Sequence, residues 1–162
     1  MNNPQEIRSL FSTNEFVGTV LRFTTVLETN VDFLLTQYFI RDDRIEAGMS
    51  LLLSDFAFSR KVELLASLPI RNGLKSRNSA VTGLRHFRRI RNIVAHNWTI
   101  SQSEVSRLLQ VEGLNKMLLE YPDEMWKSFR KTRDSLNRLI NTKDFANPHV
   151  PKDVYLGYFF HK

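Results

Sequence analysis

The chain has 162 residues, and its 23 Lys and Arg residues outnumber its 17 Asp and Glu residues, for a formal net charge of +6. This length suits one globular domain, and 11% aromatic residues with only five prolines and six glycines exclude a disordered or low-complexity chain. The absence of cysteine excludes disulfides, a cysteine nucleophile and thiolate metal sites. No stretch approaches the roughly 18 apolar residues of a membrane span, and the N-terminus lacks a signal-peptide pattern. We therefore expect a cytoplasmic protein with a single domain over residues 1–162.

Apolar side chains at three- and four-residue steps predict a long amphipathic helix over residues 13–39. Ser12 and Glu15 have the spacing of a capping box at its start. A mainly apolar run over residues 49–68, ended by Pro69, predicts a second and well-buried helix.

A third helix is predicted over residues 78–95, with Gly83 weakening its first turns. Ser101 or Ser103 then caps a shorter helical stretch, in which Gly113 is a break. These segments continue the helical pattern without an intervening linker or repeat.

Pro122, followed by two acidic residues, predicts the start of a last helix, because proline is tolerated there and acids complement the helix dipole. No segment alternates convincingly with period two, apart from the short stretch 154–158. The aromatic tail, residues 145–162, is expected to dock on the bundle or on a second subunit. The fold class is therefore predicted to be all-α, a bundle of four to five main helices with a short docked C-terminal tail.

The basic residues are concentrated in one window, since no acidic residue lies between Glu63 and Glu104. Seven cations fall inside that window: Arg71, Lys75, Arg77, Arg85, Arg88, Arg89 and Arg91. A field of one sign favours an anionic partner, and phosphate esters are the commonest candidates. The alternative is a solvated helix face without a ligand.

The stretch 84–97 divides into two faces when it is wound as a helix. The apolar face holds Leu84, Phe87, Ile90, Ile93 and Val94, and the opposite face holds Arg85, Arg88, Arg89, Asn92 and His96. Arg91 lies at the edge of the apolar sector. Guanidinium groups bind phosphate oxygens in a bidentate fork, and imidazole titrates near neutrality, so this face suits the binding and cleavage of a phosphodiester.

Residues 91–96 read R-N-I-V-A-H and resemble the R-N-x-x-A-H form of the R-x(4–6)-H motif of the HEPN superfamily. These are all-α proteins that include many metal-independent ribonucleases of defence and toxin–antitoxin systems. Residues 56–65 resemble the F-x-x-K-I-x-L-L helix that precedes the motif in HEPN members close to the mannitol-repressor group. The similarity covers residues 49–97, together with a long first helix, and implies a HEPN-like bundle.

The resemblance implies roles for individual residues. Arg91 would hold the scissile phosphate, His96 would act as general acid or base in attack by the ribose 2′-hydroxyl, and Asn92 would orient the imidazole or touch the phosphate. Arg85, Arg88 and Arg89 are the predicted RNA-binding side chains. This chemistry requires no metal and no cofactor.

The spacing also has a geometric consequence. Five residues on a helix place Arg91 and His96 about 140° apart, which is a poor arrangement for closing both side chains on one phosphate. Two copies facing each other across a dyad would supply arginine from one helix and histidine from the other, and HEPN proteins resemble this plan in assembling the site at a dimer interface. We therefore expect a homodimer with the site at the interface.

Several other residues have two interpretations. Family members often add an acid from the first helix, and Glu28 and Asp32 are the candidates here. The alternative is that these two carboxylates pair with Arg22, Arg85 or Arg88. His86 is interpreted as a surface or core-edge residue rather than a catalytic one. Trp98 is interpreted either as a packing residue at the helix end or as a platform for base stacking.

The leading hypothesis is a HEPN-type endoribonuclease that serves as toxin or effector of a toxin–antitoxin or anti-phage defence system, with RNA as substrate and an antitoxin protein as a further partner. The alternative is a non-catalytic regulatory protein, similar to the mannitol-repressor branch, that binds a protein or nucleic acid. Toxicity on expression that His96→Ala relieves would favour the enzyme.

Overall fold

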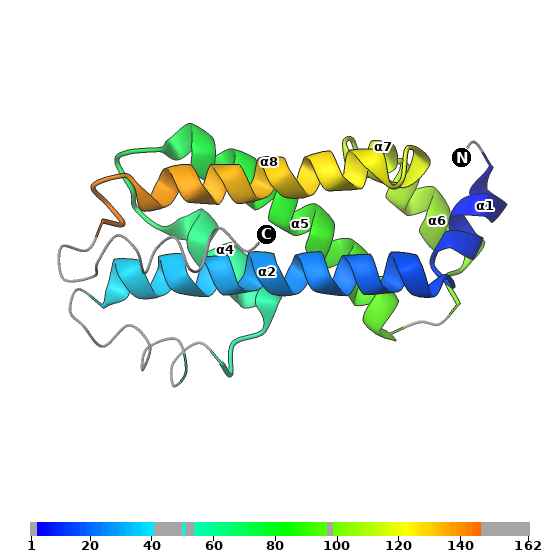
Figure 1. Cartoon of the computed structure of the whole chain (residues 1–162), viewed down its shortest axis with the longest axis horizontal. Coiled ribbons are helices and arrows are strands. Elements are labelled where there is room, and N and C mark those ends of the chain that lie inside the picture. The colour runs from blue at the N-terminus through cyan, green and yellow to red at the C-terminus, as the bar shows by residue number, and fades with distance from the viewer. Residues whose placement is uncertain (1–2, 41–49, 51–53, 97–98, 147–162) are drawn as a thin grey trace. The chain divides into compact units, whose positions relative to one another are not determined.

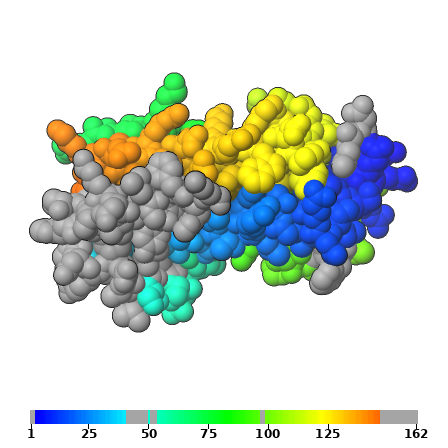
Figure 2. Space-filling model, in the orientation of Figure 1, coloured from blue at the N-terminus to red at the C-terminus, as the bar shows by residue number. Residues whose placement is uncertain are grey.

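The computed structural model describes residues 3–40, 50, 54–96 and 99–146, and the other residues are grey in Figures 1 and 2. The described residues form seven α-helices and no β-strand, which confirms the predicted all-α fold. The chain divides into two compact units, one made of residues 1–24 and 86–130 and the other of residues 25–85 and 131–162. The alternating stretch 154–158 and the rest of the tail beyond residue 146 lie outside the described residues.

The first unit has an aromatic core. It comprises α1 (Pro4–Leu10), the start of α2 (Asn14–Phe39), the end of α5 (Leu74–His96), α6 (Gln102–Leu109), α7 (Leu114–Leu119) and the start of α8 (Asp123–Ile140), labelled in Figure 1. Phe23 of α2 stacks on Phe129 of α8, with ring centroids 4.1 Å apart, and meets Phe87 of α5 edge-on at 6.2 Å. Phe16 is likewise in edge contact with Phe11 and Tyr121. These rings join three helices around one centre.

The second unit comprises the remainder of α2, α4 (Phe58–Ser67), the start of α5 and the end of α8. Its core consists of aliphatic side chains with little or no exposed surface: Leu27, Val31, Leu34, Val62, Leu65, Leu84, Leu136 and Leu139. Beyond α8, the Asp144 carboxylate accepts hydrogen bonds from the backbone N–H groups of Arg71 and Asn72, at 3.2 and 2.8 Å. The connection before α5 is thereby tied to the segment after α8.

The helix starts in the N-terminal region differ from the prediction. Helix α1 was not predicted; it begins with Pro4 after Asn3, whose side chain accepts from the Gln5 N–H. Because α1 ends at Leu10, Ser12 lies in the turn that follows, and the predicted capping box is wrong. Thr13 caps α2 instead, accepting from the Phe16 N–H at 3.4 Å.

The second and third predicted helices have different limits in the structure. Helix α4 begins at Phe58, so the predicted helix is wrong for residues 54–57, which form a turn; residues 49 and 51–53 lie outside the described residues. Ser54 and Asp55 favour turns because their side chains compete for backbone hydrogen bonds. Helix α5 starts at Leu74, four residues earlier than predicted.

The remaining helix boundaries agree with the prediction. Ser101, rather than Ser103, caps α6: its hydroxyl accepts from the Glu104 N–H, and the Glu104 carboxylate accepts from the Ser101 N–H. Gly113 separates α6 from α7 with φ of 80°, a conformation that glycine adopts without strain. Helix α8 begins at Asp123, directly after Pro122.

Gly83 is a packing residue in the second unit, not a weak point of α5. A Cβ atom at this position would overlap the hydroxyl oxygen of Thr132 on α8 and lie 3.0 Å from the Thr132 Cβ and Cγ2 atoms. Nearby, the buried Ser135 hydroxyl of α8 is hydrogen-bonded to Ser79 of α5 at 3.2 Å. Small side chains therefore let α5 and α8 approach closely here.

We expect Gly83→Ala to lower the free energy of unfolding by about 1–3 kcal/mol, although alanine is the better helix former, because rotating Thr132 cannot remove the contact with its Cβ. Urea unfolding measures the change. Gly18→Ala on α2 is the matched control, since nothing lies within 4 Å of a Cβ there. That variant should gain up to about 1 kcal/mol. A stabilising effect at both glycines would contradict the packing role of Gly83.

Candidate functional site

The C-terminal half of α5 presents the motif residues to solvent. Asn92 and His96 are exposed and Arg91 is half-buried, whereas Phe87 and Ile90 are buried. This pattern agrees with the predicted division of the helix into two faces. The side chains of Arg91, Asn92 and His96 make no hydrogen bond or ion pair with any other described residue, so their polar groups are available to a ligand.

Helix α5 holds the motif on a well-anchored element. Phe87 has no exposed surface and makes edge contacts with Phe23 and Phe129, so the helix is fixed to α2 and α8 one turn before Arg91. The helix continues without a break to His96, its last residue. A packed helix restricts the directions in which the motif side chains point, which favours a preorganised site. Trp98 lies outside the described residues.

The predicted RNA-binding arginines are not equivalent. The Arg85 guanidinium lies on the Glu63 carboxylate, with Nη2 2.8 Å from Oε2 and Nε 3.2 Å from Oε1. This bidentate pair belongs to the second unit, and it partly neutralises the basic window. In the first unit, Arg89 is exposed and Arg88 is half-buried. Arg89 is therefore the one of these three side chains that is exposed and makes no ion pair with a described residue.

His86 is packed inside the first unit. It is half-buried, and its imidazole lies so close to Gly113 that a Cβ there would be 3.0 Å from the His86 Cε1. Burial lowers the pKa of His86 below its ordinary value, and the charge of Arg89 lowers it further. The side chain is thus neutral at pH 7, in agreement with its interpretation as a core-edge residue.

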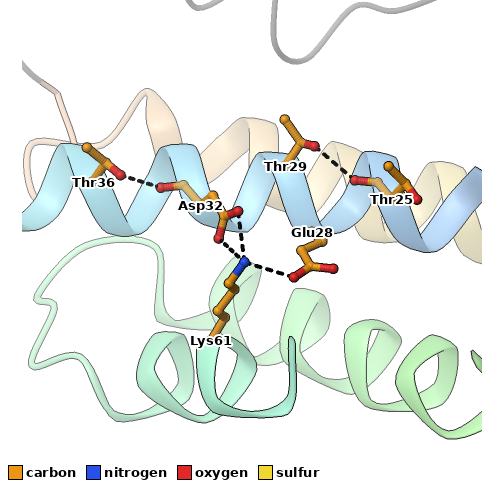
Figure 3. Close-up of polar contacts among 6 residues, drawn as sticks. All are labelled: Thr25, Glu28, Thr29, Asp32, Thr36 and Lys61. Carbon is orange, nitrogen blue, oxygen red and sulfur yellow. Dashed lines mark hydrogen bonds and ion pairs between the residues drawn. The ribbon is translucent and has the colours of Figure 1, made fainter. Parts of the chain in front are cut away.

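Glu28 and Asp32 meet a buried lysine rather than any arginine (Figure 3). The Lys61 ammonium of α4 lies 2.8 Å from Glu28 Oε1 and 2.9 Å from both Asp32 oxygens, and only 4% of the lysine side chain is exposed. The predicted pairing with Arg22, Arg85 or Arg88 is wrong. The chain did carry a signal for Lys61: a lysine inside the apolar pattern of residues 58–65 needs an anionic partner.

One ammonium in this cluster faces two carboxylates. Burial raises the pKa of Asp32 to about 6, the hydrogen bond and charge of Lys61 oppose this, and the charge of Glu28 adds to it. Burial lowers the pKa of Lys61, but the two carboxylates outweigh burial and hold it above its ordinary value. The lysine stays charged, and Asp32 takes up a proton under mildly acidic conditions, because one cation compensates only one buried carboxylate.

The described residues contain no group of three or more His, Asp or Glu side chains that would hold a metal ion. Within the same part of the chain, no helix has both the length and the apolar character needed to cross a membrane. Comparison with family models, curated proteins and solved structures finds no match to this chain.

We expect Asp32 to make stability depend on pH between its ordinary pKa of 3.8 and about 6. Its folded-state pKa is raised, so the folded chain binds more protons than the unfolded chain in this window, and stability falls as the pH rises. Asp32→Asn cannot ionise and leaves Glu28 to pair with Lys61. The free energy of unfolding of Asp32→Asn minus that of the parent should therefore increase as the pH rises across this window, by an amount on the order of 1–2 kcal/mol.

Urea unfolding of both proteins at pH 4, 5, 6 and 7 measures this difference. The control is Asp134→Asn, because the side chain of Asp134 is 52% exposed. Its difference from the parent should change little with pH. A constant difference for Asp32→Asn over the same range would show that Asp32 does not titrate there.

Proposed function

We propose that this chain is a metal-independent endoribonuclease that serves as toxin or effector of a toxin–antitoxin or anti-phage defence system. The observation that carries the proposal is the R-N-x-x-A-H sequence of Arg91, Asn92 and His96, on a packed helix whose motif side chains have no partner among the described residues. Its resemblance to the HEPN motif supplies the reaction. An antitoxin protein is the partner that such a system implies.

The chemistry requires only groups that the motif contains. His96 takes the proton of a ribose 2′-hydroxyl, whose oxygen attacks the adjacent phosphorus. Arg91 binds the non-bridging oxygens and stabilises the charge that develops on them. The P–O5′ bond breaks, the 5′-oxygen takes a proton from water, and the other strand end keeps a 2′,3′-cyclic phosphate; His96 then returns its proton to solvent. DNA is not a substrate, because it lacks the attacking hydroxyl.

A second copy of the chain completes the proposed site. Arg91 and His96 are five residues apart on one continuous helix, which separates their directions by about 140°. An isologous dimer with its axis near the ends of two α5 helices brings arginine of one copy to histidine of the other. Ile93 and Val94, which are only half-buried, supply apolar surface beside the motif for such a contact.

The second candidate is a non-catalytic regulatory protein that binds a protein or nucleic acid through the same bundle. The ion pairs of Glu28 and Asp32 with Lys61 favour this second candidate, because the two acids of α2 are then engaged in a structural ion cluster. The two candidates differ in turnover. Binding of RNA that depends steeply on salt, with no cleavage at any salt concentration, is expected only of the regulatory protein.

We expect the purified protein to cleave mixed cellular RNA in excess EDTA, and His96→Ala and Arg91→Ala each to lose at least about 100-fold in rate. Arg8→Ala, an exposed arginine on α1, is the matched control and should cleave like the parent. Circular dichroism checks that all variants fold, and end analysis should find 2′,3′-cyclic or 3′-phosphates. Equal cleavage by parent and both variants would assign the activity to another site or to a contaminant.

Mixing the two inactive variants tests the shared site. In mixed dimers, one site combines Arg91 of the His96→Ala chain with His96 of the Arg91→Ala chain, so an equal mixture should recover about a quarter of the parent activity. The chains must first exchange partners, which mass spectrometry of the intact dimers verifies. No recovery despite verified exchange would place both groups of each site in one chain.

A further inference from the structure

Trp126 is a partly exposed aromatic residue in the first unit. It lies in the first turn of α8 and has 40% of its surface exposed. Two buried rings hold it: Phe23 meets it at a centroid distance of 4.5 Å and an angle of 75°, and Phe129 at 6.2 Å and 88°. Both contacts are edge-to-face, so the indole is fixed in orientation while part of its surface stays open to solvent.

Two exposed arginines lie near Trp126, one on α2 next to Phe23 and one on α8. Arg22 is exposed on α2, and its guanidinium carbon lies 5.9 Å from the centroid of Phe23, the ring that also contacts Trp126. Arg130 is exposed one helical turn after Trp126. Neither arginine forms an ion pair with a carboxylate of the described residues. Figure 2 shows the face on which the start of α8, in yellow, meets the start of α2, in blue.

The acidic residues near Trp126 do not cancel this charge. Glu124 is engaged by Lys127 at 2.5 Å and by Lys116 at 3.5 Å. Asp123 is exposed at the first position of α8, where it complements the helix dipole. The guanidinium groups of Arg22 and Arg130 thus have no carboxylate partner among the described residues. Surfaces that bind an unpaired nucleic-acid strand combine an exposed aromatic ring with cationic side chains.

We infer that Trp126, Arg22 and Arg130 form a binding surface for single-stranded RNA, in which a base stacks on the indole and the two guanidinium groups contact flanking phosphates. The inference deepens the proposed function, on which it rests for the choice of RNA, and makes unpaired strands the substrate class. A base in a duplex is stacked on its neighbours and is not available to the ring.

The test measures binding to a strand that the proposed reaction cannot cut. A fluorescein-labelled deoxythymidine 12-mer lacks the 2′-hydroxyl, so its binding, followed by anisotropy, does not depend on catalysis. We expect Trp126→Ala to weaken binding about tenfold and Trp126→Phe to retain most of the affinity, since phenylalanine keeps a stacking face. Arg22→Ala and Arg130→Ala should each reduce the slope of log affinity against log salt by about 0.7.

Two controls separate stacking from a loss of structure. Arg8→Ala removes an exposed arginine of the same unit outside this surface and should leave the affinity and the salt slope unchanged. A Trp98→Phe background leaves Trp126 as the only tryptophan, and its fluorescence should be quenched by the 12-mer. This direct signal holds even if Trp126→Ala is less stable than the parent.

The inference is overturned if the parent does not bind the strand, if Trp126→Ala binds as tightly as the parent, or if a duplex of equal length binds as well as the single strand. A surface that serves a protein partner would give the first of these results. Strand binding that depends on Trp126 without RNA cleavage would overturn the proposed nuclease and leave this surface standing. Cleavage that depends on His96 but not on Trp126 would support the proposed nuclease and overturn this inference.

Discussion

The burial of polar side chains on α2 is the constraint on which the second unit depends. The carboxylates of Glu28 and Asp32 are largely buried, and the Lys61 ammonium on α4 compensates their charge from 2.8 and 2.9 Å. Asn30 and Gln37 have no exposed surface, and their amide groups make no hydrogen bond with the described residues. Such groups cost free energy, so the apolar contacts of α2 must outweigh that cost.

Helix α5 packs without burying unpaired polar groups of the motif. Near its start, glycine and serine replace larger side chains, and the α5 backbone at Gly83 lies directly against the Thr132 side chain of α8. Further along, Phe87 anchors the helix within an aromatic cluster. The polar groups that remain, on Asn92 and His96, are exposed and cost nothing to maintain. A helix fixed by packing on one face can thus keep uncommitted polar groups on the other, which is what a binding or catalytic site requires.

Local patterns predicted most of the fold. The 26-residue helix α2, the cap of α6 at Ser101 and the start of α8 after Pro122 all follow from apolar periodicity and cap chemistry, which act over a few residues. The predicted cap at Ser12 and the predicted helix at residues 54–57 were wrong, because the alternatives differ by small local energies. Of the candidate site, the exposure of His96 and Asn92 was predictable from the two faces of α5.

The sequence by itself determined the all-α class, the order of the main helices and the chemical character of the motif, because residue type and spacing act locally. Only the tertiary structure decided that Lys61 is the partner of Glu28 and Asp32, that Gly83 is needed for a close approach, and that Trp126 lies exposed against Phe23. These contacts join residues distant in the chain. Their identity depends on which helix faces meet, and many combinations of faces satisfy the same apolar pattern.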